Sequence, residues 1–331
     1  MTEIILSQDH RIRQHPRETN EGFIMSRGSH SRRRGSRHQA RLSEANLFYK
    51  EKMEKYHHPF TPVVDVAKLH ENSHRVYVPA NKDGARIMGL TTDWHTSSKR
   101  THEDEIERYI DHALKEGVTH FFHGGDMHDG LNIYPGQIHD VVATTVEEQV
   151  DRAAKLLDKV LPKGTKMWGI AGNHDGGVGF SGLYPKFGID MMKMLEQAIP
   201  EKFKYLHDNG EPKLGARVWV ANNTSLDLIH TKAYPGPRGA PEYTLMKIVD
   251  GYHPDGRPDF MFVGHTHKAC NTLYKGVNAF LGGGFEDANE WMRRNQVDGN
   301  RQGGYVMVFY TNNKGEMVDH HFHFIETRRG I

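Results

Sequence analysis

Polar side chains follow five short apolar runs of the chain, at the points where predicted strands end. The polar stretches read "TDWHT", "GGDMHDG", "GNHDG", "LIHTK" and "GHTHK" in chain order. Each stretch alone is weak evidence, because Asn, Asp and Gly are ordinary turn residues. Ligands of α/β sheets bind beyond the carboxyl ends of the strands, however, so the five stretches are expected to converge on one site.

The order of predicted elements supports an α/β architecture. From about residue 84, apolar runs alternate with amphipathic segments, and we expect helices over 102–117 and over roughly 140–161, the second ending at Pro162. Closely spaced strands follow toward the C-terminus. This succession indicates a second sheet that is mixed or mainly antiparallel.

The spacing within two of the polar stretches suggests how their side chains are directed. Asp93 and His95 are two residues apart, as are His265 and His267. If these residues continue their strands, alternation directs both members of each pair to the same face and toward one metal site.

Taken together and in this order, the five stretches resemble the calcineurin-like metallophosphoesterase superfamily over roughly residues 86–285. The resemblance implies a four-layered α/β/β/α sandwich with two metal ions between the sheets. It also implies a set of ligands: Asp93, His95 and His267 for the first ion, Asn173, His230 and His265 for the second, and Asp126 as a bridge between them.

The donor atoms of this set indicate which ions it suits. Seven oxygen and nitrogen ligands without a thiolate favour Mn²⁺, with Fe or Zn²⁺ as further possibilities. Two divalent metal ions polarise a phosphoryl oxygen and lower the pKa of a bridging water. The implied reaction is hydrolysis of a phosphoester by the metal-bridging hydroxide.

Two further residues receive catalytic roles from the resemblance. His174 is expected to face the substrate and protonate the leaving oxygen, and Asp129 is expected to orient its imidazole. Asp129 precedes Gly130, so an ordinary turn residue is the alternative. Asp175 is expected to be structural.

One segment narrows the resemblance further. The stretch "DGLNIYPGQ", with a following helix that contains "EQ", is similar to the exonuclease subunit of the archaeal D-family DNA polymerases. The N-terminal oligonucleotide-binding domain of that subunit is not evident in this chain.

The first part of the chain has a different composition. Residues 26–41 contain six arginines and no acidic residue, whereas the whole chain has a net charge of only +1. We expect a basic, disordered arm at 1–42, a helical or extended connector at 43–83 and the metallophosphoesterase domain at 84–331. The arm is either a solvated tail or a contact for nucleic-acid phosphates. Protein partners are not indicated.

The composition indicates the cellular compartment of the protein. A single cysteine excludes an internal disulfide framework. The absence of an 18-residue apolar run and of a leader-like segment predicts no membrane association and a cytoplasmic protein.

Three functions remain open from the sequence. The basic arm and the polymerase-subunit resemblance favour a DNA or RNA nuclease. The alternative is a phosphodiesterase or phosphatase that acts on a small nucleotide-like ester. An inactive interaction subunit is disfavoured, because every predicted ligand position holds a residue that can bind metal.

Overall fold

The computed structural model describes most of the chain after residue 72. The described residues are 66, 69, 73–134, 136–175, 188–207, 214–231, 240–289, 292–293 and 301–329. All of them belong to one unit, Phe60–Ile331. The predicted arm (1–42) and most of the connector (43–83) lie outside the described residues, so those two assignments stay predictions.

One six-stranded sheet is built from the first predicted strands and a C-terminal hairpin. Its order is β12-β11-β2-β3-β4-β5. Strands β2 to β5 are parallel, and β11 pairs antiparallel with both β2 and β12. The strands are β2 (Arg86–Thr91), β3 (His120–His123), β4 (Lys166–Gly169), β5 (Phe203–Tyr205), β11 (Arg301–Thr311) and β12 (Met317–Arg329).

The second six-stranded sheet is mixed, as the sequence indicated. Its order is β1-β6-β7-β8-β10-β9, with parallel pairs β1–β6, β7–β8 and β8–β10 and antiparallel pairs β6–β7 and β9–β10. The strands are β1 (His74–Arg75), β6 (Gly215–Ala221), β7 (Thr224–His230), β8 (Phe260–Gly264), β9 (Cys270–Tyr274) and β10 (Val277–Leu281). Because β1 lies before residue 84, the predicted connector contributes a strand to this sheet.

Four α-helices and two short 3₁₀ helices accompany the sheets in the described part of the chain. They are α2 (Glu103–Lys115), α3 (Val146–Val160), α5 (Met191–Ala198), α6 (Pro241–Asp250), η2 (Gln137–His139) and η3 (Pro254–Gly256). Helix α3 begins later than expected because a capping box between Thr145 and Glu148 fixes its first turn. Helix α5 was not predicted. No described helix has the length and apolar character needed to cross a membrane.

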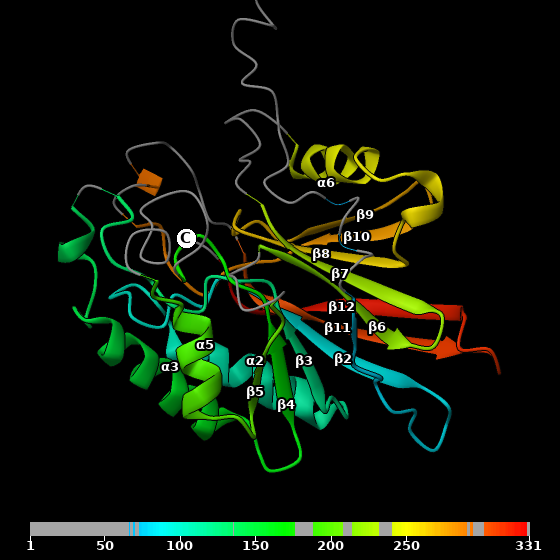
Figure 1. Cartoon of the computed structure of the whole chain (residues 1–331), viewed down its shortest axis with the longest axis horizontal. Coiled ribbons are helices and arrows are strands. Elements are labelled where there is room, and N and C mark those ends of the chain that lie inside the picture. The colour runs from blue at the N-terminus through cyan, green and yellow to red at the C-terminus, as the bar shows by residue number, and fades with distance from the viewer. Residues whose placement is uncertain are drawn as a thin grey trace, which may run out of the picture. The chain divides into compact units, whose positions relative to one another are not determined.

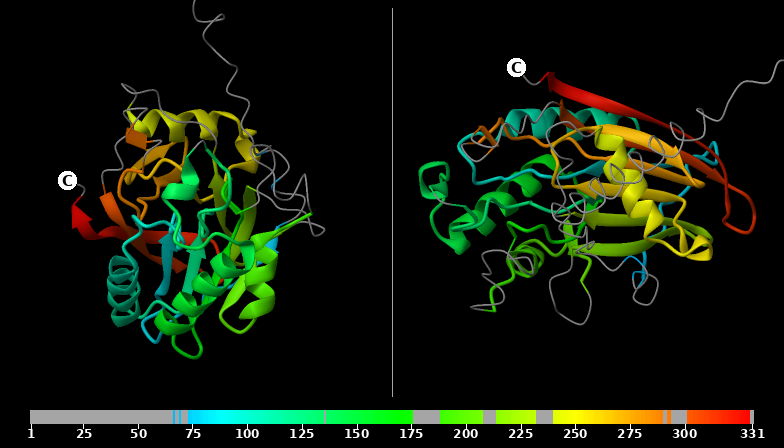
Figure 2. Two further views of the ribbon diagram at one scale, coloured as in Figure 1. Left: turned by 90° about the vertical axis from the view of Figure 1, so that its left-hand side faces the viewer. Right: turned by 90° about the horizontal axis from the view of Figure 1, so that it is seen from above.

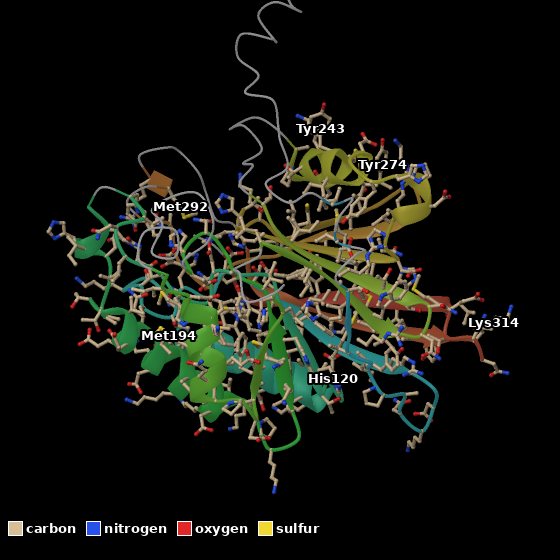
Figure 3. All side chains as sticks on the ribbon, in the orientation of Figure 1. His120, Met194, Tyr243, Tyr274, Met292 and Lys314 are labelled. Carbon is tan, nitrogen blue, oxygen red and sulfur yellow. The ribbon has the colours of Figure 1, made fainter. Side chains whose placement is uncertain are left out.

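The elements form four layers, with α6 on one side of the two sheets and α2, α3 and α5 on the other (Figures 1 and 2). Tyr243 on α6 and Met194 on α5 mark these outer layers in Figure 3. Three apolar cores fill the interfaces: one between the sheets, and one between each sheet and its helices. The predicted α/β/β/α sandwich is confirmed.

A buried ion pair links the mixed sheet to the segment after α6. The guanidinium of Arg217 on β6 donates two hydrogen bonds to the carboxylate of Asp227 on β7, at 2.7 and 2.8 Å. The hydroxyl of Tyr252 donates to Asp227 Oδ2 at 2.6 Å. All three residues are buried, so loss of the carboxylate would leave a buried guanidinium without its counter-charge.

We therefore expect Asp227→Ala to lower the free energy of unfolding by about 3–5 kcal/mol, as measured by urea denaturation. The matched control is Asp111→Ala on α2, which breaks an exposed pair with Lys115 and should cost about 0.3–0.5 kcal/mol. Equal losses in the two variants would show that the buried pair adds nothing beyond a surface one.

Candidate metal centre

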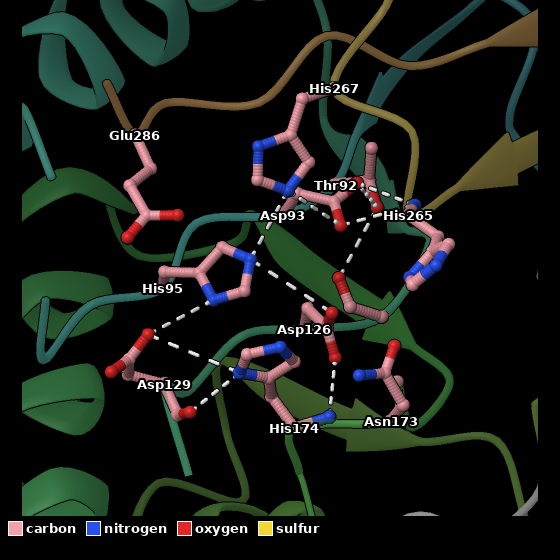
Figure 4. Close-up of polar contacts among 12 residues, drawn as sticks. Thr92, Asp93, His95, Asp126, Asp129, Asn173, His174, His265, His267 and Glu286 are labelled. Atoms are coloured by element: carbon pink, nitrogen blue, oxygen red, sulfur yellow. Dashed lines mark hydrogen bonds and ion pairs between the residues drawn. The ribbon is translucent and has the colours of Figure 1, made fainter. Parts of the chain in front are cut away.

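The five polar stretches converge where strands of both sheets end (Figure 4). In one sheet they follow the parallel strands β2, β3 and β4, and in the other they lie at the ends of β7 and β8. Because parallel strands present their carboxyl ends at one edge, each sheet supplies its ligands from one edge. All seven predicted metal ligands lie in this centre.

Five of the seven predicted ligands have left-handed backbone conformations. They are Asp93 (φ 53°), His95 (φ 44°), Asp126 (φ 55°), His265 (φ 88°) and His267 (φ 52°). These residues lie beyond the last residues of their strands, so the argument from strand alternation was wrong. His265 and His267 in fact belong to two different groups of side chains. Non-glycine residues with positive φ concentrate at functional sites.

The first group contains Asp93, His95 and His267. One donor atom from each lies within 4.8 Å of the others. The Nε2 atoms of His95 and His267 are 3.3 Å apart, and His267 Nε2 is 3.4 Å from Asp93 Oδ1. Two imidazole nitrogens and a carboxylate oxygen at these separations suit the coordination sphere of one divalent ion.

The second group contains Asp126, His230 and His265, again within 4.8 Å. His230 Nε2 lies 3.0 Å from Asn173 Oδ1 and 3.1 Å from Asp126 Oδ2. Its other nitrogen, Nδ1, donates to the carbonyl of Gly124 at 2.8 Å. That bond places a hydrogen on Nδ1, so Nε2 is the nitrogen able to bind a metal.

Asp126 lies between the two groups. Its Oδ2 is 3.1 Å from His230 Nε2 in one group and 3.9 Å from His95 Nε2 in the other. Its Oδ1 accepts the backbone N–H of His174 at 2.8 Å, which fixes the carboxylate. The predicted bridging position is therefore one that the side chain can fill.

The charges of the side chains in this centre also suit cations. Burial lowers the pKa of His230, but the carboxylate of Asp126 outweighs it and raises the pKa to about 9. Burial also lowers the pKa of His95, but the nearby carboxylates of Glu286 and Asp129 outweigh burial and raise that pKa. The carboxylates thus favour positive charge at these two imidazoles, a role that divalent ions would fill when bound.

The predicted acid, His174, lies beside both groups, and one of its ring nitrogens forms a third candidate group with His95 and Asp126, within 4.8 Å. Its ring is 4.6 Å from that of His95, edge to face, and only 9% of the residue is exposed. Its Nδ1 donates to the backbone carbonyl of Asp129 at 2.6 Å, whereas the Asp129 carboxylate is 4.0 Å away. That carboxylate is closer to His95 Nδ1, at 3.4 Å. The expected contact between His174 and Asp129 is present, but it is made mainly by the main chain.

Asp175 has the structural role that the sequence suggested. Its carboxylate accepts the backbone N–H groups of Gly172 and His128, at 2.8 and 2.9 Å. It also lies 2.8 Å from the ring Nδ1 of His128. These contacts tie the end of β3 to the end of β4, the two segments that supply Asp126 and Asn173.

Sequence reasoning missed Glu286. Its carboxylate lies beside His95 in Figure 4 and accepts a hydrogen bond from the hydroxyl of Ser98 at 2.6 Å. The residue is 3% exposed. It follows a glycine run after β10 and carries no spacing signal, so nothing in the sequence distinguished it from a surface acid.

Asp126→Asn should weaken metal binding in both groups, because the charge that faces both is lost. We expect metal analysis after equilibration with Mn²⁺ to show less metal in both groups. The affinity of the second group for Mn²⁺ should fall by at least about tenfold. Asp255→Asn, at an exposed position in η3, is the control and should retain the full content. Retention of two tightly bound ions by Asp126→Asn would exclude a bridge.

Comparison with known proteins agrees with this geometry. The chain matches the family described as calcineurin-like phosphoesterase over residues 88–269. It is 25% identical over 272 residues to the DNA polymerase II small subunit of Archaeoglobus fulgidus, covering 70% of this chain and 55% of that one. Against the subunit of Pyrococcus horikoshii, identity is 29% over 223 residues, with coverages of 57% and 35%. The chain spans about half the length, or less, of these relatives.

Solved structures give a weaker likeness. One described as a novel archaeal phosphodiesterase is 14% identical, with 72% of this chain and 99% of that chain covered and a TM-score of 0.37. The phosphoesterase Yfce from E. coli is also 14% identical, with coverages of 71% and 97% and a TM-score of 0.35. The family match, which spans more than half of the chain, is decisive. The chain therefore belongs to the calcineurin-like phosphoesterase family and is a metal-dependent phosphoesterase.

Proposed function

We propose that this phosphoesterase is a dinuclear phosphodiesterase that cleaves DNA or RNA. The observation that carries the dinuclear part is the position of Asp126, whose carboxylate faces both groups of ligands. The nucleic-acid part is supported by the curated relatives, which are DNA polymerase II small subunits. The arginines of residues 26–41 support it as well.

In this proposal Asp93, His95 and His267 hold one ion, and Asn173, His230 and His265 hold the other. Asp126 completes both sites. When bound, the two ions supply Lewis-acid polarisation of the phosphoryl oxygen and lower the pKa of water, and Mn²⁺ is the ion we expect.

His174 is proposed as the proton donor to the leaving oxygen. The carbonyl of Asp129 holds a hydrogen on Nδ1, so the proton that can be transferred is the one on Nε2. Figure 4 shows this second nitrogen directed into the centre. The roles of the two ring nitrogens are thereby separated, one for orientation and one for chemistry.

Asp129 is proposed to serve two histidines at once. Its carbonyl orients His174, and its carboxylate faces Nδ1 of His95, 3.4 Å away. A metal-binding histidine is commonly oriented by a carboxylate on its second nitrogen, which also makes it a better ligand. Asp129 therefore links the proton donor to the first metal group.

His174→Ala should lower kcat by about 10²–10⁴-fold on esters with poor leaving groups, while metal content is kept. Esters of 4-nitrophenol should be affected much less, because that leaving group needs little protonation. Asp129→Asn keeps the carbonyl, so its larger effect should be on metal affinity through His95. Equal slowing of all esters by His174→Ala, or loss of metal from that variant, would contradict the role of proton donor.

The substrate class is tested with the whole chain, Mn²⁺ and three probes: single-stranded DNA, duplex DNA and bis(4-nitrophenyl) phosphate. A nuclease should bind and cut DNA with a steep dependence on salt, whereas hydrolysis of the small ester should change little. The control variant replaces Arg32, Arg33, Arg34 and Arg37 by Gln. It should flatten the salt dependence for DNA and leave the small ester unaffected.

Two results would contradict the proposed action on nucleic acid or the proposed role of the arginines. Hydrolysis of the small ester and of cyclic nucleotides without cleavage of DNA or RNA would favour a phosphodiesterase of small nucleotide-like esters. An unchanged salt dependence in the arginine variant would show that residues 26–41 do not contact the nucleic acid.

A further inference from the structure

Two buried glutamines lie between the metal centre and the helices that follow it. Gln137 begins η2 and Gln149 is on α3, and their exposed fractions are 2% and 0%. Both belong to the segment whose sequence resembles the polymerase subunit, yet neither has a role in the chemistry described above. Each of them reaches back to the loop formed by Asp129 and Gly130.

The amide of Gln137 has an orientation that its partners determine. Its Oε1 accepts the backbone N–H of Ile133 at 2.8 Å, and a backbone N–H can only donate. Its Nε2 therefore faces Asp129, donating to the backbone carbonyl at 2.7 Å and to carboxylate Oδ2 at 3.1 Å. One side chain thus holds both oxygen-bearing groups of Asp129.

Gln149 secures the next residue of the loop. Its Oε1 accepts the N–H of Gly130, and its Nε2 donates to the carbonyl of Gly130, both at 2.9 Å. Gly130 has a positive φ of 71°, and a Cβ there would lie 2.4 Å from the carbonyl oxygen of His174. The loop is therefore fixed from one side by Gln149 and packs directly against the backbone of His174 on the other.

The carbonyl of Asp129 receives two donors, which use both of its lone pairs. One is Nε2 of Gln137 at 2.7 Å, and the other is Nδ1 of His174 at 2.6 Å. The direction of the carbonyl is set by the glutamine, and the direction of the imidazole is set by the carbonyl. Loss of the glutamine would therefore leave the carbonyl, and with it the imidazole, less firmly oriented.

We infer that Gln137 is a positioning residue for the reaction, acting through the Asp129 carbonyl on the imidazole of His174, with Gln149 securing the same loop. The inference rests on the proposed role of His174 as proton donor. Gln137, in the stretch "IYPGQ", and Gln149, in the stretch "EQ", would thus align that proton donor with the leaving group.

The test compares Gln137→Met with the unchanged protein on 4-nitrophenyl, phenyl and methyl diesters of thymidine 5′-phosphate, with Mn²⁺ present. Methionine keeps the volume and removes both hydrogen bonds to Asp129. We expect kcat to fall about tenfold to hundredfold on the methyl ester, much less on the 4-nitrophenyl ester, and metal content to be retained.

A double variant shows whether the effect passes through His174. If it does, Gln137→Met combined with His174→Ala should be no slower on the methyl ester than His174→Ala alone. Multiplied losses would overturn the inference, as would an equal loss on all three esters in the single variant. The control is Asn278→Leu, which removes a buried amide near the start of β10, where Nδ2 donates to the carbonyl of Asp259 at 3.4 Å and Oδ1 accepts from His320 Nε2 at 3.0 Å.

The outcomes distinguish the positioning role of Gln137 from the proton-donor role of His174. If His174→Ala itself slows all esters equally, the proton-donor role is wrong. If the loss of kcat in His174→Ala depends on the leaving group and the loss in Gln137→Met does not, only the positioning role is wrong. Should Gln137→Met fail to fold, Gln137→Asn keeps an amide that is one methylene too short to reach the carbonyl, and the same comparison is made with it.

Discussion

The metal centre depends on five non-glycine residues that hold left-handed backbone conformations at the ends of β2, β3 and β8. Each such residue costs roughly 1–2 kcal/mol relative to an ordinary conformation. The cost is offset by hydrogen bonds between strand ends, such as those from the N–H of Asp93 to the carbonyl of Gly125 and from His95 to Asp126, at 3.0 and 3.1 Å. These residues follow the strand ends, and donor atoms from separate strands come within 4.8 Å of one another there.

Close backbone contact between β3 and β4 is the second condition. A Cβ on Gly172 would lie 2.0 Å from Asp126 Oδ1 and 2.3 Å from its backbone nitrogen. Only glycine at this position lets the chain pass so close to the carboxylate that faces both groups of ligands. The hydrogen bond from His230 to the carbonyl of Gly124 then joins the second sheet to the first. The centre therefore exists only when the two sheets are packed together.

The family resemblance predicted the sandwich, and residue types and chain order picked out strand ends whose side chains the structure brings together. The sequence did not predict how Asp93 and His95 are directed, because strand periodicity stops where the backbone turns left-handed. Contacts between residues far apart in the chain were not predicted from the sequence either. Glu286 meets Ser98 across 188 positions, and no local pattern reports such a contact. Helix α5 is short, with eight residues, and gave too little periodicity to recognise.

The buried negative charge of the centre bears on the binding of both cations and a phosphoester. Four carboxylates, those of Asp93, Asp126, Asp129 and Glu286, are at most 3% exposed in this small volume. Nearby carboxylates raise the pKa values of His95 and His230, so positive charge is favoured beside them. A phosphate anion entering the centre would meet these buried carboxylates at short range unless cations lay between them. In the proposed dinuclear form, divalent ions would reverse that field, and we expect their binding to favour the binding of a phosphoester.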